Sequence, residues 1–539
     1  MKFRFSLIVY CLLLIVCTST AQINRPKLVV GLVIDQMRWD YLYRYNDLYA
    51  PNGFKRLLKE GFSCDNTLIP YVPTYTAVGH TCVYTGSIPA LTGIVGNNWF
   101  DKTTGKNVYC TDDSTVTTVG NTGKAGKMSP ANLWVTSIAD ELRLSNNFKS
   151  KVIGIALKDR GAILPAGHSA NAAYWYDGGK WITSTHYMNE LPDWVKDFNA
   201  GDLAGKYMTK DWNTILPAAK YDLSTEDDKP YENKIKGESG VSFPHRLSTI
   251  PDSVKYESFR TTVFANSFTF DFAKAAIENE KLGNGTVTDL LALSISSTDY
   301  IGHSFGPNSI EIEDTYLRLD LDIAGFLQYL DEKIGKGNYL VFLTADHGVA
   351  HIPAFLAEHK IPGGSFDEGE LRKELNQSLE IFFGMKNIVS SLQNYQVYLN
   401  TAELENQGKD IAAVKALIIK NLLQKNFITS AFETAKLASV VLPESQRLML
   451  INGYNTKRSG DIQFILKPGY FDGGNKGTTH GLWNPYDAHI PLLFYGWNVK
   501  PGKTNRETYM TDIAPTVAAM LKIQMPNGCV GKVITEVVK

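Results

Sequence analysis

The sequence lacks the features that mark several large classes of protein. Its 54 lysines and arginines are balanced by 55 aspartates and glutamates, so no global basic field favours binding to nucleic acid. After residue 16, no stretch of 18 consecutive apolar residues predicts a membrane-spanning helix. The segment "PGKT" (501–504) resembles the end of a phosphate-binding loop, but Trp497 stands where that motif requires glycine. Internal repeats and low-complexity tracts are absent as well. What remains is an ordinary globular composition, 44% hydrophobic and 20% charged.

The N-terminus predicts a secretory signal peptide at residues 1–21. Basic residues precede the apolar stretch "FSLIVYCLLLIV" (5–16), and the "STA" that closes the segment fits the small-residue cleavage rule. The apolar stretch is shorter than a comfortable membrane span. The alternatives are an uncleaved anchor and a lipoprotein signal at Cys17, which the bulky residue before that cysteine disfavours. We therefore expect the mature chain to begin near Gln22 and to be periplasmic or secreted.

Cysteine is scarce, and the six cysteines form no CxxC pair and no zinc-ribbon spacing. Two of them lie in the predicted signal peptide. The other four are Cys64, Cys82, Cys110 and Cys529. In an exported protein these four allow zero, one or two disulfides, with three possible full pairings. Buried thiols or a structural bridge are the interpretation we prefer.

Continuous apolar runs rich in β-branched residues predict strands buried on both faces, as in a parallel sheet. These runs are 27–35, 151–160, 290–299, 339–347 and 489–496. Helical patterns such as 309–335 lie between them. This alternation predicts an α/β fold with a central, mostly parallel sheet flanked by helices.

Four of the five runs end in an acid, a base or an imidazole. These residues are Asp35, Lys158, Arg160, Asp299, Asp346 and His347. Ligands of such sheets gather beyond the carboxyl ends of the strands. The coincidence therefore predicts a functional site at one edge of the sheet.

Two long stretches interrupt the alternation of strands and helices. Residues 165–260 are rich in Trp, Tyr, Asp, Gly and Pro and read as irregular, whereas residues 352–470 carry helical patterns followed by a strand-like segment. We interpret both as insertions that cap the sheet edge. Residues 22–539 are then a single catalytic domain.

The residue types at this edge suit a zinc site, which carboxylates and imidazoles prefer, with three or four ligands per ion. "TDYIGH" separates Asp299 and His303 by four residues, so one helical turn can direct both at the same ion. "ADHG" places Asp346 and His347 side by side, and "GTTHG" (477–481) presents His480 from a glycine-flanked loop.

The stretch "YVPTYTAVGHT" (71–81) places Thr76 at the predicted start of a helix. A helix N-terminus favours an anion because its backbone N–H groups and its dipole point at the ligand. In isolation, such a threonine is usually a plain helix cap. His80, one helical turn further on, could belong to the core or support the site.

These motifs resemble the alkaline phosphatase superfamily. Asp35, Thr76, "TDYIGH", "ADHG" and "GTTHG" occur in the order seen in its branch of nucleotide pyrophosphatases and phosphodiesterases. Within that branch the chain looks like a PafA-type alkaline phosphatase, a monoesterase with a threonine nucleophile. The similarity spans residues from about 27 to 535.

The resemblance implies a site with two zinc ions. One ion would be held by Asp299, His303 and His480. The other would be held by Asp35, Asp346 and His347, with Thr76 also coordinating it. Zinc coordination lowers the pKa of a hydroxyl, so Thr76 would attack phosphorus in line and give a phosphothreonine. Ligation by histidines and carboxylates favours zinc, but it does not exclude another divalent ion in one of the two sites.

The substrate class depends on the remaining polar groups, since the diesterase relatives share the metal ligands. "ALKDRG" (156–161) offers Lys158 and Arg160 just after a strand, and extra cations favour a phosphate monoester, which carries more charge than a diester. The resemblance implies that both contact the phosphoryl group and that Asn97, in "VGNNWF", donates a hydrogen bond to it.

We expect a monomeric phosphomonoesterase of broad specificity that acts on small phosphate monoesters and releases inorganic phosphate. It would have no nucleic-acid scaffold and no stable membrane span. The alternative is a phosphodiesterase or nucleotide pyrophosphatase of the same superfamily. A sulfatase is disfavoured because no C/S-x-P-x-R motif lies near Thr76. A binding protein that lost turnover is disfavoured because every expected ligand is present.

Overall fold

The computed structural model describes residues 24–538. The predicted signal peptide lies outside these residues. Between residues 24 and 538, no helix is both long enough and apolar enough to cross a membrane.

A ten-stranded sheet forms the centre of the molecule, in the spatial order β20-β2-β19-β11-β1-β10-β7-β8-β9-β6. Strands β11, β1, β10, β7 and β8 are parallel, and antiparallel pairs flank them. Their bounds are β1 Leu28–Ile34, β2 Phe62–Cys64, β6 Thr118–Val119, β7 Val152–Ala156, β8 Ala172–Asp177, β9 Lys180–Ser184, β10 Asp289–Ile295, β11 Tyr339–Thr344, β19 Leu492–Gly496 and β20 Gly502–Thr504. The predicted fold class is confirmed.

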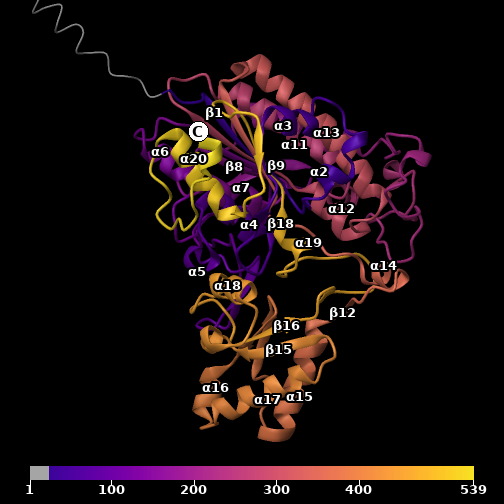
Figure 1. The fold of residues 1–539 in the computed structure, drawn as a ribbon, viewed down its shortest axis with the longest axis vertical. Helices are drawn as coiled ribbons and strands as arrows, with labels where there is room; N and C mark the ends of the chain where they lie inside the picture. The colour runs from indigo at the N-terminus through magenta and orange to yellow at the C-terminus, as the bar shows by residue number, and fades with distance from the viewer. Residues whose placement is uncertain (1–23, 539) are drawn as a thin grey trace, which may run out of the picture.

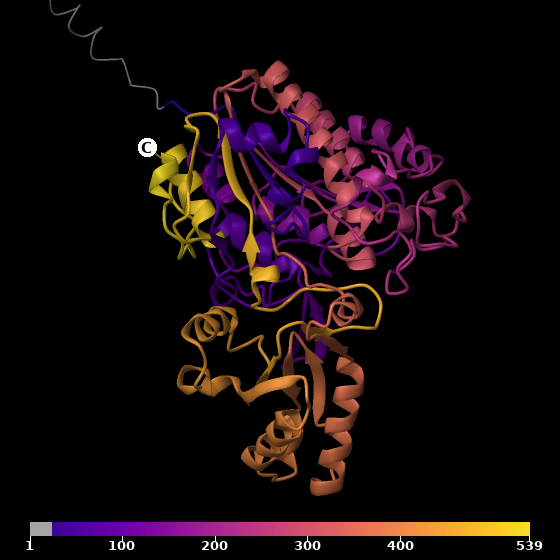
Figure 2. The same ribbon diagram turned by 45° about the vertical axis from the view of Figure 1, so that its right-hand side comes forward.

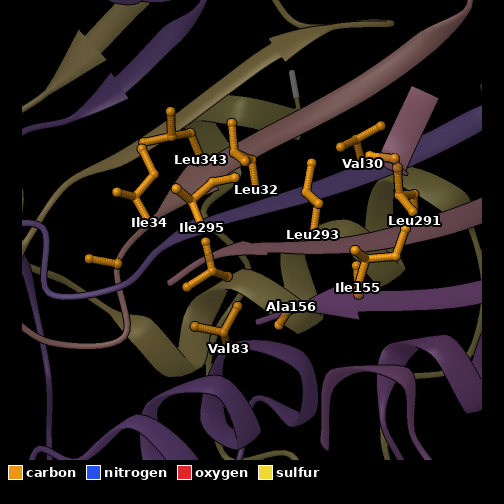
Figure 3. Packing of buried hydrophobic residues seen from close by; sticks show 14 of the residues in the cluster. Val30, Leu32, Ile34, Val83, Ile155, Ala156, Leu291, Leu293, Ile295 and Leu343 are labelled. Atoms are coloured by element: carbon orange, nitrogen blue, oxygen red, sulfur yellow. The ribbon is translucent and has the colours of Figure 1, made fainter. Parts of the chain in front are cut away.

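Helices cover both faces of this sheet (Figures 1 and 2). One layer contains α4 Thr76–Thr85, α6 Ile138–Leu144, α7 Asp159–Ala166 and α20 Ile513–Leu521. The other contains α3 Phe54–Glu60, α11 Phe264–Asn279, α12 Ser297–Phe305 and α13 Ile310–Leu330. Because both faces are covered, the central strands β1, β7, β10 and β11 are buried along their whole length. Figure 3 shows Val30, Leu32, Leu291, Leu293 and Ile155 from adjacent strands packed into this core.

The pairing register brings the carboxyl ends of the central strands to one edge. Ile34 of β1 lies opposite Ile295 of β10, and Val33 lies opposite Thr344 of β11. Ser294 in turn pairs with Ala156 of β7. The residues that follow these strands therefore emerge together, as in other open parallel sheets.

The run at 489–496 departs from the prediction of parallel strands. It divides into β18 (His489–Ile490) and β19, and β19 pairs antiparallel with β11. Pro491, which has no N–H to donate, separates the two pieces. The apolar run predicts burial on both faces correctly, but burial does not depend on strand direction.

The segment 165–260 is less irregular than its composition predicts. Strands β8 and β9 lie within it and extend the central sheet. Their aromatic side chains are core residues: Trp181 is fully buried and stacks on Phe268 and Phe272 of α11, with ring centroids 5.1 and 4.4 Å away.

The segment 352–470 forms a lobe that projects from the main body (Figure 2). It has a sheet in the order β13-β14-β16-β15 and a hydrophobic core of its own. Its elements are β12 Gly364–Phe366, α15 Glu368–Phe383, β13 Val389–Gln393, β14 Gln396–Leu399, α16 Thr401–Asn406, α17 Ile411–Leu423, β15 Ile428–Glu433, α18 Glu444–Gly453 and β16 Ile462–Leu466. The division into one catalytic domain with two insertions stays a prediction.

The four cysteines outside the predicted signal peptide are all free thiols in the described part of the chain. Cys64, Cys82 and Cys110 are buried, and Cys529 is half-buried. Of the alternatives open from the sequence, the structure therefore takes the one with no disulfide.

A buried histidine links the first insertion to α13. His245 lies between two carboxylates, with Nδ1 3.0 Å from Glu238 Oε2 and Nε2 3.3 Å from Glu311 Oε1. Burial lowers the pKa of His245, but the bonds to Glu238 and Glu311 outweigh burial and raise it to about 9. The imidazole is therefore a cation in the folded protein at neutral pH.

This pairing predicts a loss of stability at alkaline pH. The folded-state pKa of His245 lies above its ordinary value, so the stabilisation is complete below pH 6.5 and disappears as pH rises through about 9. Thermal unfolding should show that the free energy of unfolding falls more between pH 6.5 and pH 9 for the wild type than for His245→Gln. The difference between the two falls should be at most roughly 3 kcal/mol. The charge of His245 lowers the pKa of the nearby Asp227, so the difference between the two proteins reports His245 together with this coupling. Equal declines in the two proteins would contradict the assignment.

Candidate active site and metal centre

Thr76 is the first residue of α4, as the sequence predicts. The preceding Tyr75 is extended, so the helix begins abruptly and its first N–H groups have no partner within the helix. The Ala77 N–H donates to Oδ1 of Asn97 at 2.9 Å. Thr76 is 1% exposed, and its Oγ1 lies 3.4 Å from Nε2 of His347.

Asp299, His303 and His480 form the first group of possible metal ligands. One ligand atom from each lies within 4.8 Å of the others. Asp299 and His303 both come from α12, four residues apart, with Oδ1 and Nε2 3.1 Å apart. Nε2 of His480 is 3.7 Å from the same carboxylate oxygen. The structure thus brings together the three residues that the sequence assigns to one ion.

A second group of possible ligands consists of Asp35, Asp299 and His347. Nε2 of His347 lies 3.6 Å from Oδ1 of Asp35 and 3.2 Å from Oδ2 of Asp346. Asp346 therefore adjoins this group, while Asp299 lies between the two groups. The rings of His347 and His480 stack with centroids 3.4 Å apart, so the two groups are neighbours.

The histidine rings are oriented for ligation through Nε2. Nδ1 of His303 bonds the carbonyl of Thr478 at 2.7 Å, and Nδ1 of His480 bonds that of Thr74 at 2.7 Å. Nδ1 of His347 bonds the carbonyl of Gly348 at 2.9 Å. A carbonyl only accepts, so each Nδ1 carries the proton and each Nε2 is free to bind a metal ion.

The carboxylates also fit a bound cation. Within residues 24–538, Oδ1 of Asp35 and Oδ2 of Asp346 are buried and have no hydrogen-bond partner. Burial raises the pKa of Asp35 to about 7, and the adjacent Asp346 contributes to the rise. Buried carboxylates without partners are costly unless a cation neutralises them. The site is therefore suited to a metal.

Lys158 supplies positive charge directly to the ligands. Its Nζ lies 2.6 Å from Asp35 Oδ2 and 2.5 Å from Asp299 Oδ2. Burial lowers the pKa of Lys158, but the two carboxylates outweigh burial and leave the pKa raised. The structure thus places this side chain against two predicted metal ligands; its contact with a substrate stays a prediction.

Arg160 and Asn97 border the same site. The guanidinium of Arg160 donates to the hydroxyl of Tyr109 at 3.0 Å, and that hydroxyl donates to Asp159 at 2.6 Å. Nε of Arg160 has no partner among the described residues. The guanidinium therefore keeps N–H groups for a ligand. Oδ1 of Asn97 is engaged by α4, so its amide nitrogen is the group left for a ligand.

Sequence reasoning missed Gln36 and left open whether His80 belongs to the core or supports the site. Gln36 donates through Nε2 to Asp299 at 2.7 Å and through its backbone N–H to Asp346 at 3.1 Å. Gln36 directly follows Asp35, which is the one hint that the sequence offers. Its backbone φ of +66° is a left-handed conformation that the sequence does not indicate for a glutamine. His80 lies with Nδ1 3.2 Å from Asp346 and is fully buried, so it supports the site.

Comparison with known proteins identifies the family. The sequence profile of the family described as type I phosphodiesterase / nucleotide pyrophosphatase matches residues 29–489. That range covers most of the chain, and the protein belongs to this family.

The most similar relatives are alike over nearly their whole length. The chain is 56% identical over 527 residues to a Myroides odoratus protein named calcium-transporting ATPase, covering 97% of this chain and 96% of that protein. It is 53% identical to alkaline phosphatase PhoV of Synechococcus elongatus, covering 96% and 94%. It is 50% identical to alkaline phosphatase PafA of Elizabethkingia meningoseptica, covering 96% of each.

The crystal structure of wild-type PafA matches this structure with a TM-score of 0.94 at 49% identity, over 96% of this chain and 100% of that chain. The resemblance to PafA-type alkaline phosphatases is confirmed.

The first ligand group predicts a change in metal content. His480→Ala removes one imidazole from a group of three possible ligands, so we expect the variant, when loaded with zinc, to hold about one equivalent less per chain than the wild-type protein loaded in the same way. His359→Ala is the matched control, since His359 is exposed and its ring bonds the carbonyl of Phe355, away from both ligand groups. Metal analysis by mass spectrometry gives the result. Unchanged zinc in His480→Ala would show that His480 is not a ligand.

Proposed function

We propose that the protein is a zinc-dependent alkaline phosphatase that hydrolyses phosphate monoesters through a phosphothreonine at Thr76. One observation carries the proposal. The Thr76 hydroxyl stands at a helix N-terminus, 3.4 Å from His347 and beside two adjoining groups of ligands. The relatives named alkaline phosphatases, which are about half identical over nearly the whole chain, support the same activity.

Two zinc ions fit the donor set. Asp299, His303 and His480 would hold one ion. Asp35, Asp346 and His347 would hold the other, with Thr76. Bound there, zinc lowers the pKa of the hydroxyl and polarises the phosphoryl oxygens. Its positive charge would also neutralise Asp35 and Asp299, leaving the Lys158 ammonium available to a phosphoryl oxygen.

Thr76 acts as the nucleophile in the proposed reaction. The Thr76 hydroxyl loses its proton to solvent, and its Oγ forms a bond to phosphorus as the bond between phosphorus and the ester oxygen breaks. The departing oxygen takes a proton from water and leaves as the alcohol on the opposite side. The N-terminus of α4 stabilises the phosphoryl charge. Water then attacks the phosphothreonine, which releases inorganic phosphate and regenerates the hydroxyl.

Lys158, Arg160 and Asn97 bind the phosphoryl group. A monoester presents three non-bridging oxygens, and the free donors of Arg160 and Asn97 with the Lys158 ammonium supply three partners. The alternative is a diesterase, as the name of the family implies. It would depend little on the two cations, because a diester carries less charge.

The predicted signal peptide supports export, and we place the mature protein in the periplasm or outside the cell, as a monomer. Its partners would be small phosphate monoesters and the released inorganic phosphate.

Removal of the nucleophile should abolish the covalent intermediate. Thr76→Ala should lower kcat/KM on an aryl phosphate by at least about a thousandfold, because no other hydroxyl is assigned to the attack. Rapid quenching with labelled substrate should show no phosphoprotein, while zinc stays bound. Thr76→Ser, which keeps a hydroxyl, is the control and should still form the intermediate. Normal turnover by Thr76→Ala would refute the assignment.

The two cations should decide the substrate class. Lys158→Ala and Arg160→Ala should each lower kcat/KM for an aryl phosphate monoester by about a hundredfold, and that for the matching diester much less. The ratio of the two values, measured on preparations with equal zinc content, is the readout. Equal losses on both substrates would remove these residues from monoester selection.

A further inference from the structure

A tight turn of the insertion reaches the loop that carries Asn97. The turn joins β13 to β14 through Asn394 and Tyr395, both with φ of +58°. Two consecutive left-handed residues are typical of a two-residue hairpin turn, and asparagine tolerates that conformation better than most residues. The tip of this hairpin is therefore a rigid element.

Asn394 contacts the residues on both sides of Asn97. Its Nδ2 donates to the carbonyl of Asn98 at 2.8 Å. A Cβ on Gly96 would lie 2.7 Å from the same nitrogen, so only glycine lets the turn approach this closely. One side chain of the insertion thus fixes the backbone immediately before and after Asn97.

The start of the same loop is held by a second residue of the insertion. Arg458 donates through one nitrogen to the carbonyl of Gly93 at 2.6 Å and to that of Asn132 at 3.0 Å. Its guanidinium lies 4.5 Å from the ring centroid of Trp99 and 4.3 Å from that of Trp134. Residues 93–98 are therefore held at both ends by a lobe whose core is separate.

The held loop is coupled to the nucleophile. Asn97 accepts the Ala77 N–H at 2.9 Å, and Ala77 follows Thr76. This hydrogen bond fixes the side-chain oxygen of Asn97. The direction of its amide nitrogen then depends on the position of the loop backbone. A small displacement of that backbone would move the donor away from a phosphoryl oxygen.

We propose that the insertion at 352–470 positions Asn97 for phosphoryl binding and that Asn394 is the positioning residue. This inference rests on the proposed function. Asn394 touches no reacting atom; it acts through Asn97 alone.

The test is a double-mutant cycle with Asn394→Gly, which keeps the left-handed turn and removes the donor. We expect this change to lower kcat/KM on an aryl phosphate monoester by about tenfold and to weaken inhibition by inorganic phosphate by a similar factor. In the background of Asn97→Ala, the same change should alter both quantities by less than about twofold. The matched control is Lys102→Met, in the turn between β4 (Asn98–Asp101) and β5 (Lys106–Tyr109). It removes another contact of this region with the insertion, between Lys102 Nζ and Asp461 Oδ1 at 3.0 Å.

The outcomes separate the inference from the proposed function. If the losses from Asn394→Gly and Asn97→Ala multiply, or if Lys102→Met causes the same loss, Asn394 serves general stability and the inference is wrong. If Asn97→Ala alone changes nothing, the inference also falls, while the phosphatase and Thr76 stand. A wild-type protein without phosphatase activity would overturn the proposed function instead. Melting temperature and zinc content, measured for every variant, exclude losses caused by unfolding.

Discussion

The structure depends on the concentration of buried negative charge at one edge of the sheet. Asp35, Asp299 and Asp346 are all almost fully buried, and they emerge together because the parallel strands end in register. Isolated carboxylates in such a place would be strongly destabilising. Lys158 offsets part of the charge, and oriented imidazoles with free Nε2 atoms surround the rest. A bound cation would therefore stabilise this edge, and the proposed chemistry uses the same cations.

The sequence predicted those features that follow from residue type and local pattern. The buried strands appear as apolar runs because both faces of the sheet are covered. Asp35 follows its strand directly, while Asp346 and Asp299 come shortly after the ends of theirs. The start of the helix at Thr76 was predicted as well. The assigned roles of these residues came from the motif order, and they remain proposals for experiment.

Other features could not be predicted because they arise from contacts between distant segments. The direction of β19 depends on what it pairs with, and its apolar sequence is the same for either direction. Lys158 meets Asp35 and Asn394 meets Asn98 across 123 and 296 residues of chain. Strands β8 and β9 were missed because the Asp, Gly and Pro residues of the segment 165–260 indicated loops. Its aromatic residues favour strands, and Trp181 is buried against α11.

The base of the projecting lobe has a consequence for the chain as a polymer. Strand β12 pairs in parallel with β17 (Tyr470–Asp472), from Gly364 opposite Tyr470 to Phe366 opposite Asp472. The more than one hundred residues between the two strands thus form a closed unit. With the two strands paired, the chain path from His347 to His480 through the catalytic body is short. The entropy lost when these two histidines are brought together depends on the length of that short path, because the entropic cost of closing a loop grows with the number of free residues in it. Length changes in the lobe that keep this strand pair and the contacts of Asn394 and Arg458 would leave the stacked histidines in place, so only the remainder of the lobe can vary.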